Sequence, residues 1–199
     1  MTHYGNIRFI LKSGIHCPNF YGPDSSILNI GNRKLIAARG KSEIHLPPGG
    51  VLNDYVAFYF HYRMPMLYQL SRGLVEDYSG TQEEIIYLVS TAETIQRLGL
   101  SFVFTDRHAY LRHKMIFNDL KHLVQLNWNV IKDDSWYQSY SGNKKELKQA
   151  EFLIYKHLPI NGLAGIVCHN DRIANFVLEE LNVMGLSIPV AVKPEFYFL

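Results

Sequence analysis

Long apolar runs, cysteines and an excess of either charge are all scarce in this sequence. No hydrophobic run approaches the roughly 20 residues needed to cross a bilayer, and no signal peptide is recognisable after Met1. The two cysteines, Cys17 and Cys168, lie far apart and outside any metal-type spacing, so we interpret both as reduced. A formal net charge of +2 neither requires nor excludes a polyanionic partner. We therefore expect a cytoplasmic protein with no membrane attachment.

The common phosphate-binding and hydrolase motifs are also missing. The stretch LPPGG holds two glycines, but the chain has neither the G-x-G-x-x-G of dinucleotide-binding folds nor the G-K-[ST] of P-loops. H-E-x-x-H and G-x-S-x-G are absent, and His108 and His113 are spaced poorly for a metal pair on a helix. We expect no bound metal, whereas a Ser-His-Asp site assembled from distant residues stays open.

The sequence does contain enough apolar material for a packed core. Hydrophobic residues make up 47% of the 199 residues and charged residues only 19%, which argues against global disorder. Aromatic residues reach 13%, a share that suits a small enzyme, a nucleic-acid binder or a plain core. The length predicts a single domain over residues 1–199.

Hydrophobic spacing predicts strands and helices that mingle without a regular alternation. Residues 15–54 are rich in Pro and Gly and look irregular, and Ser90 with Glu93 forms a capping box. We expect strands at 55–62, 84–90, 100–106, 151–158 and 163–169, and helices at 6–14, 63–73, 90–99, 111–126 and 170–183. This mixture favours an α+β or mixed α/β fold over a doubly wound sheet.

One acid stands where a polar, helix-like segment turns into an apolar run. In KKELKQAEFLIY, Glu151 opens the predicted strand and Gln149 precedes it by two residues. Because side chains alternate along a strand, both would lie on one face. An acid there can bind a sugar hydroxyl while the amide holds a second substrate. A solvated strand end explains the same pattern.

Three longer blocks resemble a known family. PPGGVLNDYVAFYFHYRMPMLY, LSFVFTDRHA and KQAEFLIYKHLP are similar to the DarT toxins, DNA-modifying ADP-ribosyltransferases, and the likeness runs from THYGNI to the terminal KPEFYF. The resemblance implies the ADP-ribosyltransferase fold, a split mixed β-sheet that clasps NAD and carries flanking helices.

The same resemblance implies an activity and its partners. NAD would be consumed as co-substrate, with release of nicotinamide, and the acceptor would be a base, thymidine or guanosine, in single-stranded DNA. The protein would be a monomeric toxin paired with a DarG-like macrodomain antitoxin. A transferase directed at RNA or protein, or an inactive nucleic-acid-binding module on the same fold, remains an alternative.

Residues of the active site follow from the resemblance position by position. Glu151 matches the catalytic glutamate, and Arg39 in IAARGKSEI best matches the essential arginine, with Arg33 as a rival. The NAD-binding loop would lie at about residues 22–41, and further NAD contacts are expected from Thr2, His3, Asn6 and His108. Gln149 would position the acceptor base.

A substrate-recognition segment is expected between His108 and Glu151. It interleaves aromatic and basic residues, as single-stranded nucleic-acid binding requires, and the expected DNA contacts are Trp136, Tyr137, Tyr140, Lys144, Lys145 and Lys148. A solvated helix with core aromatics is the open alternative. The family differs in carrying a histidine two residues before its threonine, which here would precede Met1, and a histidine where this chain has Asn53.

Overall fold

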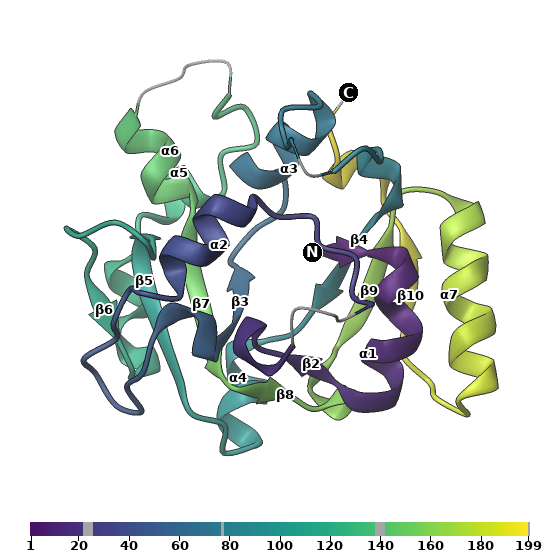
Figure 1. Ribbon diagram of the computed structural model, residues 1–199, viewed down its shortest axis with the longest axis horizontal. Coiled ribbons are helices and arrows are strands. Elements are labelled where there is room, and N and C mark those ends of the chain that lie inside the picture. The colour runs from purple at the N-terminus through teal and green to yellow at the C-terminus, as the bar shows by residue number, and fades with distance from the viewer. Residues whose placement is uncertain (22–25, 77, 138–141, 199) are drawn as a thin grey trace.

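Two small sheets, set apart from each other, form the frame of the molecule. The computed structural model describes residues 1–21, 26–76, 78–137 and 142–198. One sheet has the strand order β3-β7-β5-β6, the other has the order β1-β4-β9-β10, and a short ribbon of β2 and β8 runs between them. Figure 1 shows the two sheets on either side of a central gap in the ribbon.

The first sheet is antiparallel throughout and carries the candidate catalytic acid. Its strands, in spatial order, span Tyr55–Tyr59, Ala150–Tyr155, Phe102–His108 and Ile116–Phe117. β7 pairs with β3 on one side and with β5 on the other, so it is a central strand. Its nearly continuous apolar run suits that position, because both of its faces are buried.

The second sheet is mixed, as the split fold requires. Its strands span Thr2–His3, Ile85–Val89, Gly165–Cys168 and Val190–Val192, and β9 runs parallel to β10 while the other pairs are antiparallel. The connecting ribbon consists of β2, Ile15–His16, and β8, His157–Leu158. The α+β architecture with a split mixed sheet is therefore confirmed.

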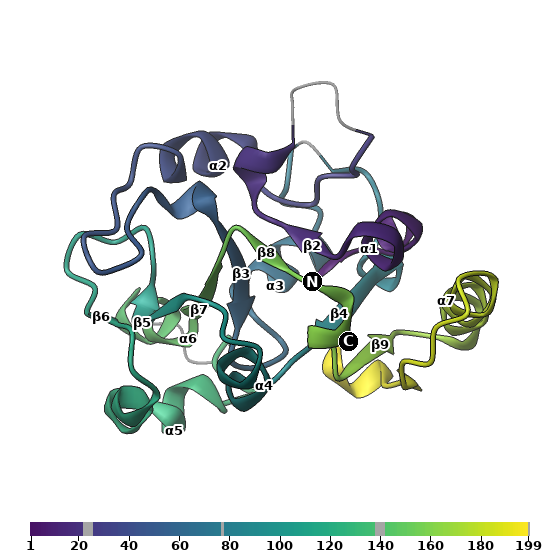
Figure 2. The ribbon, with the colours of Figure 1, turned by 90° about the horizontal axis from the view of Figure 1, so that it is seen from below.

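Helices cover both sheets. α1 (Ile7–Ser13) and α7 (Asp171–Val183) pack on the second sheet, and α7 starts where Asn170 accepts a hydrogen bond from the Ile173 amide. On the first sheet, α2 (Arg33–Arg39) lies on one face and α4 (Ala92–Arg97) and α5 (Trp128–Ile131) lie on the other, as Figure 2 shows. α3 (Pro65–Ser71) follows β3, and α6 (Gly142–Lys148) leads into β7.

Short 3-10 turns complete the described chain. They span Tyr4–Asn6, Pro18–Phe20, Leu52–Asp54, Gln82–Glu84, Leu120–Gln125, Ile160–Gly162 and Pro194–Phe196. Gly14 ends α1 at φ 78°, as predicted, in a conformation that a side chain disfavours. The expected cap of α4 is off by one residue, because Thr91 accepts from the Thr94 amide while the Ser90 hydroxyl donates to the Gly162 carbonyl.

Two predicted segments are wrong, and both lie near the site. Residues 15–54 are not irregular throughout, because Asn32 caps α2 by accepting from the Leu35 amide. Residues 111–126 are not one helix, because the short strand β6 pairs with β5 there and a 3-10 turn follows. Pairing with a neighbouring strand outweighs helical spacing in the sequence.

Candidate active site

Glu151 is the second residue of β7, and only 2% of its surface is exposed. Leu153 and Tyr155 share its face, whereas Phe152 and Ile154 pack into the core beneath α4 and α5. The register of β5 against β7 shifts beside it, and the Glu151 amide donates to the Thr105 hydroxyl over 3.2 Å. The acid is thus set at an irregular, buried end of a rigid strand.

Arg39 reaches this carboxylate from the last turn of α2. Its two terminal nitrogens donate to the two oxygens of Glu151 over 3.0 and 2.8 Å, and the side chains are only 13% and 3% exposed. Asn53, where the family resemblance has histidine, donates its amide to the Ile36 carbonyl over 2.9 Å and so fixes the end of α2. The structure brings Arg39, and not its rival Arg33, against Glu151.

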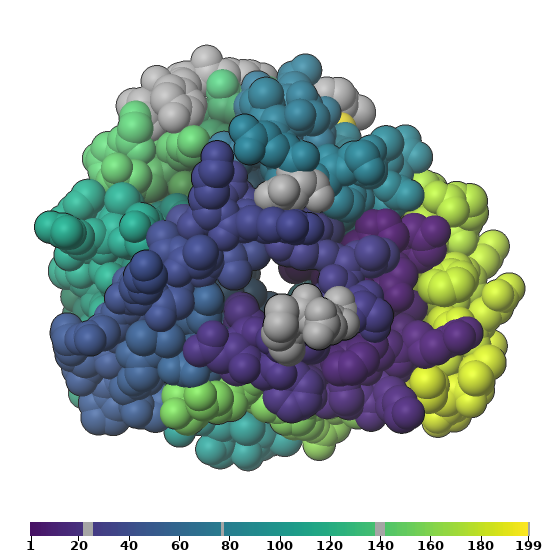
Figure 3. Space-filling view, in the orientation of Figure 1, coloured from purple at the N-terminus to yellow at the C-terminus, as the bar shows by residue number. Residues whose placement is uncertain are grey.

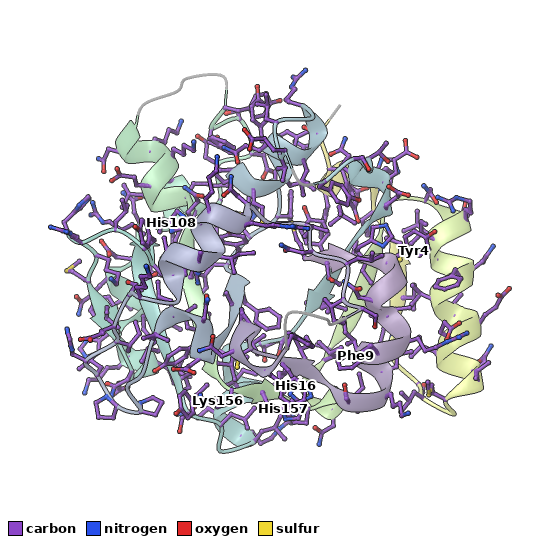
Figure 4. All side chains as sticks on the ribbon, viewed as in Figure 1. Tyr4, Phe9, His16, His108, Lys156 and His157 are labelled. Atoms are coloured by element: carbon purple, nitrogen blue, oxygen red, sulfur yellow. The ribbon has the colours of Figure 1, made fainter. Side chains whose placement is uncertain are left out.

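Two further groups face the same carboxylate. The Ala109 amide donates to Oε1 of Glu151 over 3.0 Å, and Nδ1 of His108 lies 3.3 Å from the same oxygen. Figure 4 places His108 on the side of the central opening that carries α2, away from the stacked pair His16 and His157 at the lower rim. His108, expected to contact NAD, therefore also orients the acid.

The charges of the pair are fixed by their surroundings. Burial by itself would raise the pKa of Glu151, but the Arg39 charge and hydrogen bonds from His108 and Arg39 lower it to about 2. Burial would likewise lower the pKa of Arg39, and the Glu151 charge more than offsets this, so the arginine pKa is raised. At neutral pH the site thus holds a carboxylate and a guanidinium.

Tyr59 is a site residue that the sequence did not reveal. It lies opposite Glu151 in the β3–β7 register, and burial raises its pKa, with a further contribution from the Glu151 charge. It also lines a cavity of about 270 Å³ between β3 and β4, whose walls are largely aromatic. Strand alternation alone could have flagged Tyr59 only if the pairing of β3 with β7 had been known.

The predicted NAD contacts at the N-terminus lie on the second sheet, across the split from Glu151. The Asn6 amide donates to the Thr2 hydroxyl and to the Leu28 carbonyl, and its oxygen accepts from the Leu28 amide, each over 2.9 Å. A direct NAD contact of Asn6 is therefore not supported, because its polar atoms hold the loop at Leu28. His3 accepts from the Gly5 amide through Nδ1 and stacks on Tyr4.

Gln149 does not share a strand face with Glu151. β7 begins at Ala150, and the Gln149 side chain donates over 3.1 Å to the Lys145 carbonyl of α6, where it is 9% exposed. The expected role in holding a base is therefore not supported. Gln149 instead closes the junction between α6 and β7.

The aromatic part of the predicted DNA-binding segment is largely interior. Trp136 is 2% exposed, donates its indole N–H to the Arg63 carbonyl over 2.7 Å and packs among core residues. Tyr137 is half-buried and stacks on Tyr68. This structure does not support the DNA contact predicted for Trp136, because the side chain is buried. Tyr140 lies outside the described residues.

The lysines of the predicted DNA-binding segment are also buried or half-buried. Lys148 is fully buried, and its ammonium donates to the Ile131 and Asp133 carbonyls over 2.6 and 3.0 Å. Burial lowers the pKa of Lys148 to about 8. A contact between Lys148 and a DNA phosphate is therefore not supported by this structure. Lys144 pairs with Asp133 over 2.6 Å, and Lys145 is half-buried on α6.

Metal-binding clusters and membrane-spanning helices are absent from the described chain. Over residues 1–21, 26–76, 78–137 and 142–198, no group of three or more His, Cys, Asp or Glu side chains is arranged to hold a metal ion. Within those same ranges, no helix has the length and apolar character that crossing a membrane requires. The Arg39–Glu151 pair remains the strongest candidate for chemistry.

Comparison with known proteins decides the family. A family model described as DarT, ssDNA thymidine ADP-ribosyltransferase, matches residues 1–198. The chain belongs to the DarT family. A DNA ADP-ribosyl transferase of Thermus sp. (strain 2.9) is 39% identical over 194 residues, which cover 98% of this chain and 89% of that protein. One from Escherichia coli is 33% identical over 199 residues, covering 100% and 91%.

Solved DarT structures share the fold closely. Thermus sp. 2.9 DarT in complex with ADP-ribosylated ssDNA superposes with a TM-score of 0.93 at 36% identity, covering 99% of this chain and 93% of that one. The same protein in complex with NAD+ gives a TM-score of 0.89, covering 99% and 94%. The resemblance stated from the three sequence blocks is thereby confirmed.

Proposed function

We propose that this DarT-family chain transfers ADP-ribose from NAD to a thymidine base in single-stranded DNA and releases nicotinamide. The observation that carries the proposal is the buried, bidentate Arg39–Glu151 pair, set in the split between two sheets of the DarT fold. The Thermus relatives were solved with NAD+ and with ADP-ribosylated ssDNA, which supports both substrates. The family description supports thymidine over guanosine.

Glu151 supplies the negative charge that the reaction needs. As the bond between ribose C1 and the nicotinamide nitrogen breaks, nicotinamide leaves with the bonding pair and positive charge develops on the ribose. A buried carboxylate stabilises that charge and accepts a hydrogen bond from a ribose hydroxyl. With its pKa lowered to about 2, Glu151 is ionised at neutral pH without any further proton transfer.

Arg39 acts as a cation in this proposal and not as a base. Its raised pKa leaves no neutral guanidine to accept a proton at physiological pH. Its fork orients both oxygens of Glu151 and is available to NAD phosphates when the co-substrate enters. Thr2, His3 and His108 are proposed to complete the NAD contacts, with Asn6 holding the loop at Leu28.

The acceptor must be unpaired for the transfer to occur. Thymine has one ring N–H in its nucleotide, and that nitrogen bonds to ribose C1 while its proton passes to water. In a duplex this edge is base-paired, and exposing it costs a few kcal/mol. Single strands are therefore the expected substrate, and duplex DNA should react poorly.

The setting of the enzyme follows from its family. We propose a toxin that acts in the cytoplasm as a monomer, through one catalytic domain, and is opposed by a DarG-like macrodomain antitoxin that removes the ADP-ribose. Support comes from the likeness to DarT proteins over nearly the whole chain. Co-expression with such a macrodomain should restore growth to cells that the chain otherwise arrests.

The decisive experiment supplies labelled NAD with separate pools of single-stranded DNA, duplex DNA, RNA and protein. Label should enter thymidine-containing single strands, and Glu151→Gln should lower the rate by at least about a hundredfold, as loss of a main electrostatic stabiliser does. Label in RNA or protein would identify a transferase with another acceptor. Equal activity of Glu151→Gln would show that the acid is not catalytic.

A further inference from the structure

Helix α2 presents two different faces. Arg39 points inward to Glu151, whereas Lys34, Ala37 and Ala38 form a stripe on the helix that lines a surface groove. Lys41 lines the same groove from the turn that follows the helix. The two small alanines leave room along this stripe, and a lysine stands at each end. The outward stripe is therefore hollow in the middle and basic at its ends.

A groove runs along this stripe. Its volume is about 720 Å³, and its opposite wall is the turn after β5 that carries Tyr110, Leu111 and Arg112. We call this space the α2 groove. Figure 3 shows the atoms of α2 lying across the front face beside the central opening. The same helix thus lines the α2 groove and, through Arg39, contacts the catalytic acid.

The charge of the α2 groove has one sign. Lys34, Lys41 and Arg112 line it, and no carboxylate is among its lining residues. Lys34 pairs with Glu76 over 3.7 Å, and because the two side chains are 87% and 80% exposed, water and salt screen this ion pair strongly. In a chain whose formal net charge is only +2, this is a local concentration of positive charge.

The far wall is rigid and connected to the catalytic acid. The Met115 amide donates to the buried Asp106 carboxylate over 2.7 Å. The Leu111 amide donates to the His108 carbonyl over 3.0 Å, so hydrogen bonds hold the turn at both places. Ala109 donates to Glu151, and Tyr110 is the next residue, with 43% of its surface exposed. An aromatic ring thus stands one residue from the catalytic contact.

We infer that the α2 groove binds the single-stranded DNA that flanks the target base, with Lys34, Lys41 and Arg112 on phosphates and Tyr110 against a neighbouring base. Cations that follow the backbone and an exposed aromatic ring are the two features that single-strand binding combines. A strand lying there would reach Glu151 past the end of α2. This inference rests on the proposed function for the identity of the nucleic acid.

The test compares two triple variants of equal charge change. Lys34→Ala, Lys41→Ala and Arg112→Ala together remove the cations of the α2 groove. Lys12→Ala, Arg97→Ala and Lys121→Ala together remove exposed cations of other elements. Binding of a fluorescent thymidine-containing single strand is measured by anisotropy over a range of salt, and hydrolysis of NAD without DNA is measured beside it.

The groove variant should bind the strand at least about tenfold more weakly, and the slope of log affinity against log salt should fall by about 2, since each lost phosphate contact removes about 0.7. The DNA affinity of the control variant should stay within about twofold of the unmodified protein. The groove variant should keep measurable NAD hydrolysis, although Lys34 and Lys41 lie in the expected NAD-binding loop. Tyr110→Ala should weaken binding at least about fivefold and leave the salt slope unchanged.

Equal losses in the two triple variants, or unchanged binding in the groove variant, would overturn the inference. Loss of NAD hydrolysis together with DNA binding would assign the groove to NAD and would also overturn it. Because strand binding is measured without transfer, an unmodified protein that binds DNA through the groove yet never labels it would count against the proposed function alone.

Discussion

Two regions of this protein combine lysines or arginines with aromatic rings, and they differ in what covers them. In the segment before β7, Trp136 and Lys148 are buried and bonded to backbone carbonyls. In the α2 groove, Tyr110 is 43% exposed and the cations line open space. Similar composition thus serves the core in one region and a surface in the other. Burial, which composition does not report, separates the two.

The physical reason lies in the partners that the chain itself provides. A buried ammonium needs acceptors, and the carbonyls of Ile131 and Asp133 supply them to Lys148. A buried indole needs one acceptor, and the Arg63 carbonyl supplies it to Trp136. These bonds hold both side chains inside the protein. In this structure the two residues therefore contribute to packing beside the segment that leads into β7.

The largest expected loss of activity comes from replacing Arg39, on the face of α2 that contacts Glu151. Arg39→Ala should lower both DNA modification and NAD hydrolysis by about a thousandfold, since it removes the charge that keeps Glu151 ionised and oriented. Arg39→Lys should recover little, because one ammonium cannot donate to both oxygens. Steady-state rates with labelled NAD provide the measurement, with Arg33→Ala as the matched control.

Replacing Arg39 should also change how the reaction rate depends on pH. In Arg39→Ala the buried Glu151 loses the Arg39 charge and hydrogen bonds, so its pKa should rise and the acidic limb of the rate profile should move to higher pH. If Arg33→Ala abolished activity while Arg39→Ala preserved it, the assignment of the arginine would be wrong.

A second, smaller effect contrasts Trp136 with Tyr110. Trp136→Ala should destabilise the protein by about 3–5 kcal/mol, because it empties a packed site and removes the hydrogen bond to Arg63. Below its melting temperature the variant should still bind single-stranded DNA normally. Tyr110→Ala should show the reverse pattern, with little change in stability. Thermal unfolding and anisotropy on both variants measure this, and weak DNA binding by a fully stable Trp136→Ala would refute it.

The smallest expected effect is on the pH dependence of stability, through Lys148. Burial lowers its folded-state pKa from 10.5 to about 8, so between these values the unfolded chain holds the extra proton and stability rises with pH. In Lys148→Met that rise should be missing, and the difference between the two proteins should widen as pH goes from about 8 to about 10. Urea unfolding at several pH values tests this, and parallel curves for the two proteins would show that Lys148 does not titrate in this range.

Several strands and helix ends could be predicted from the sequence alone. Apolar runs located β4, β7 and β9, and Gly14 and Asn170 marked a helix end and a helix start correctly, because these signals are local. α2 was missed although Asn32 and Gly40 bracket it, since the surrounding Pro and Gly suggested irregular structure.

Signals that depend on tertiary contacts were less visible. The segment at 111–126 has helical spacing, yet strand pairing with β5 and the Asp106 carboxylate hold part of it extended. Gln149 and Glu151 looked paired only on the assumption that both lay in one strand. Tyr59 and the α2 groove emerge only once β3, β7 and the turn at Tyr110 are placed in space.

The most direct measurement is a photo-cross-link between the protein and its DNA. A single strand carrying 5-iodouracil next to the target thymidine is bound to Glu151→Gln, irradiated, and the linked peptide is identified by mass spectrometry. The arrangement of the α2 groove predicts that the link falls on the peptide containing Tyr110, beside the Ala109 contact to the catalytic acid. A link to the peptide containing Trp136 and Tyr137 instead would contradict the account.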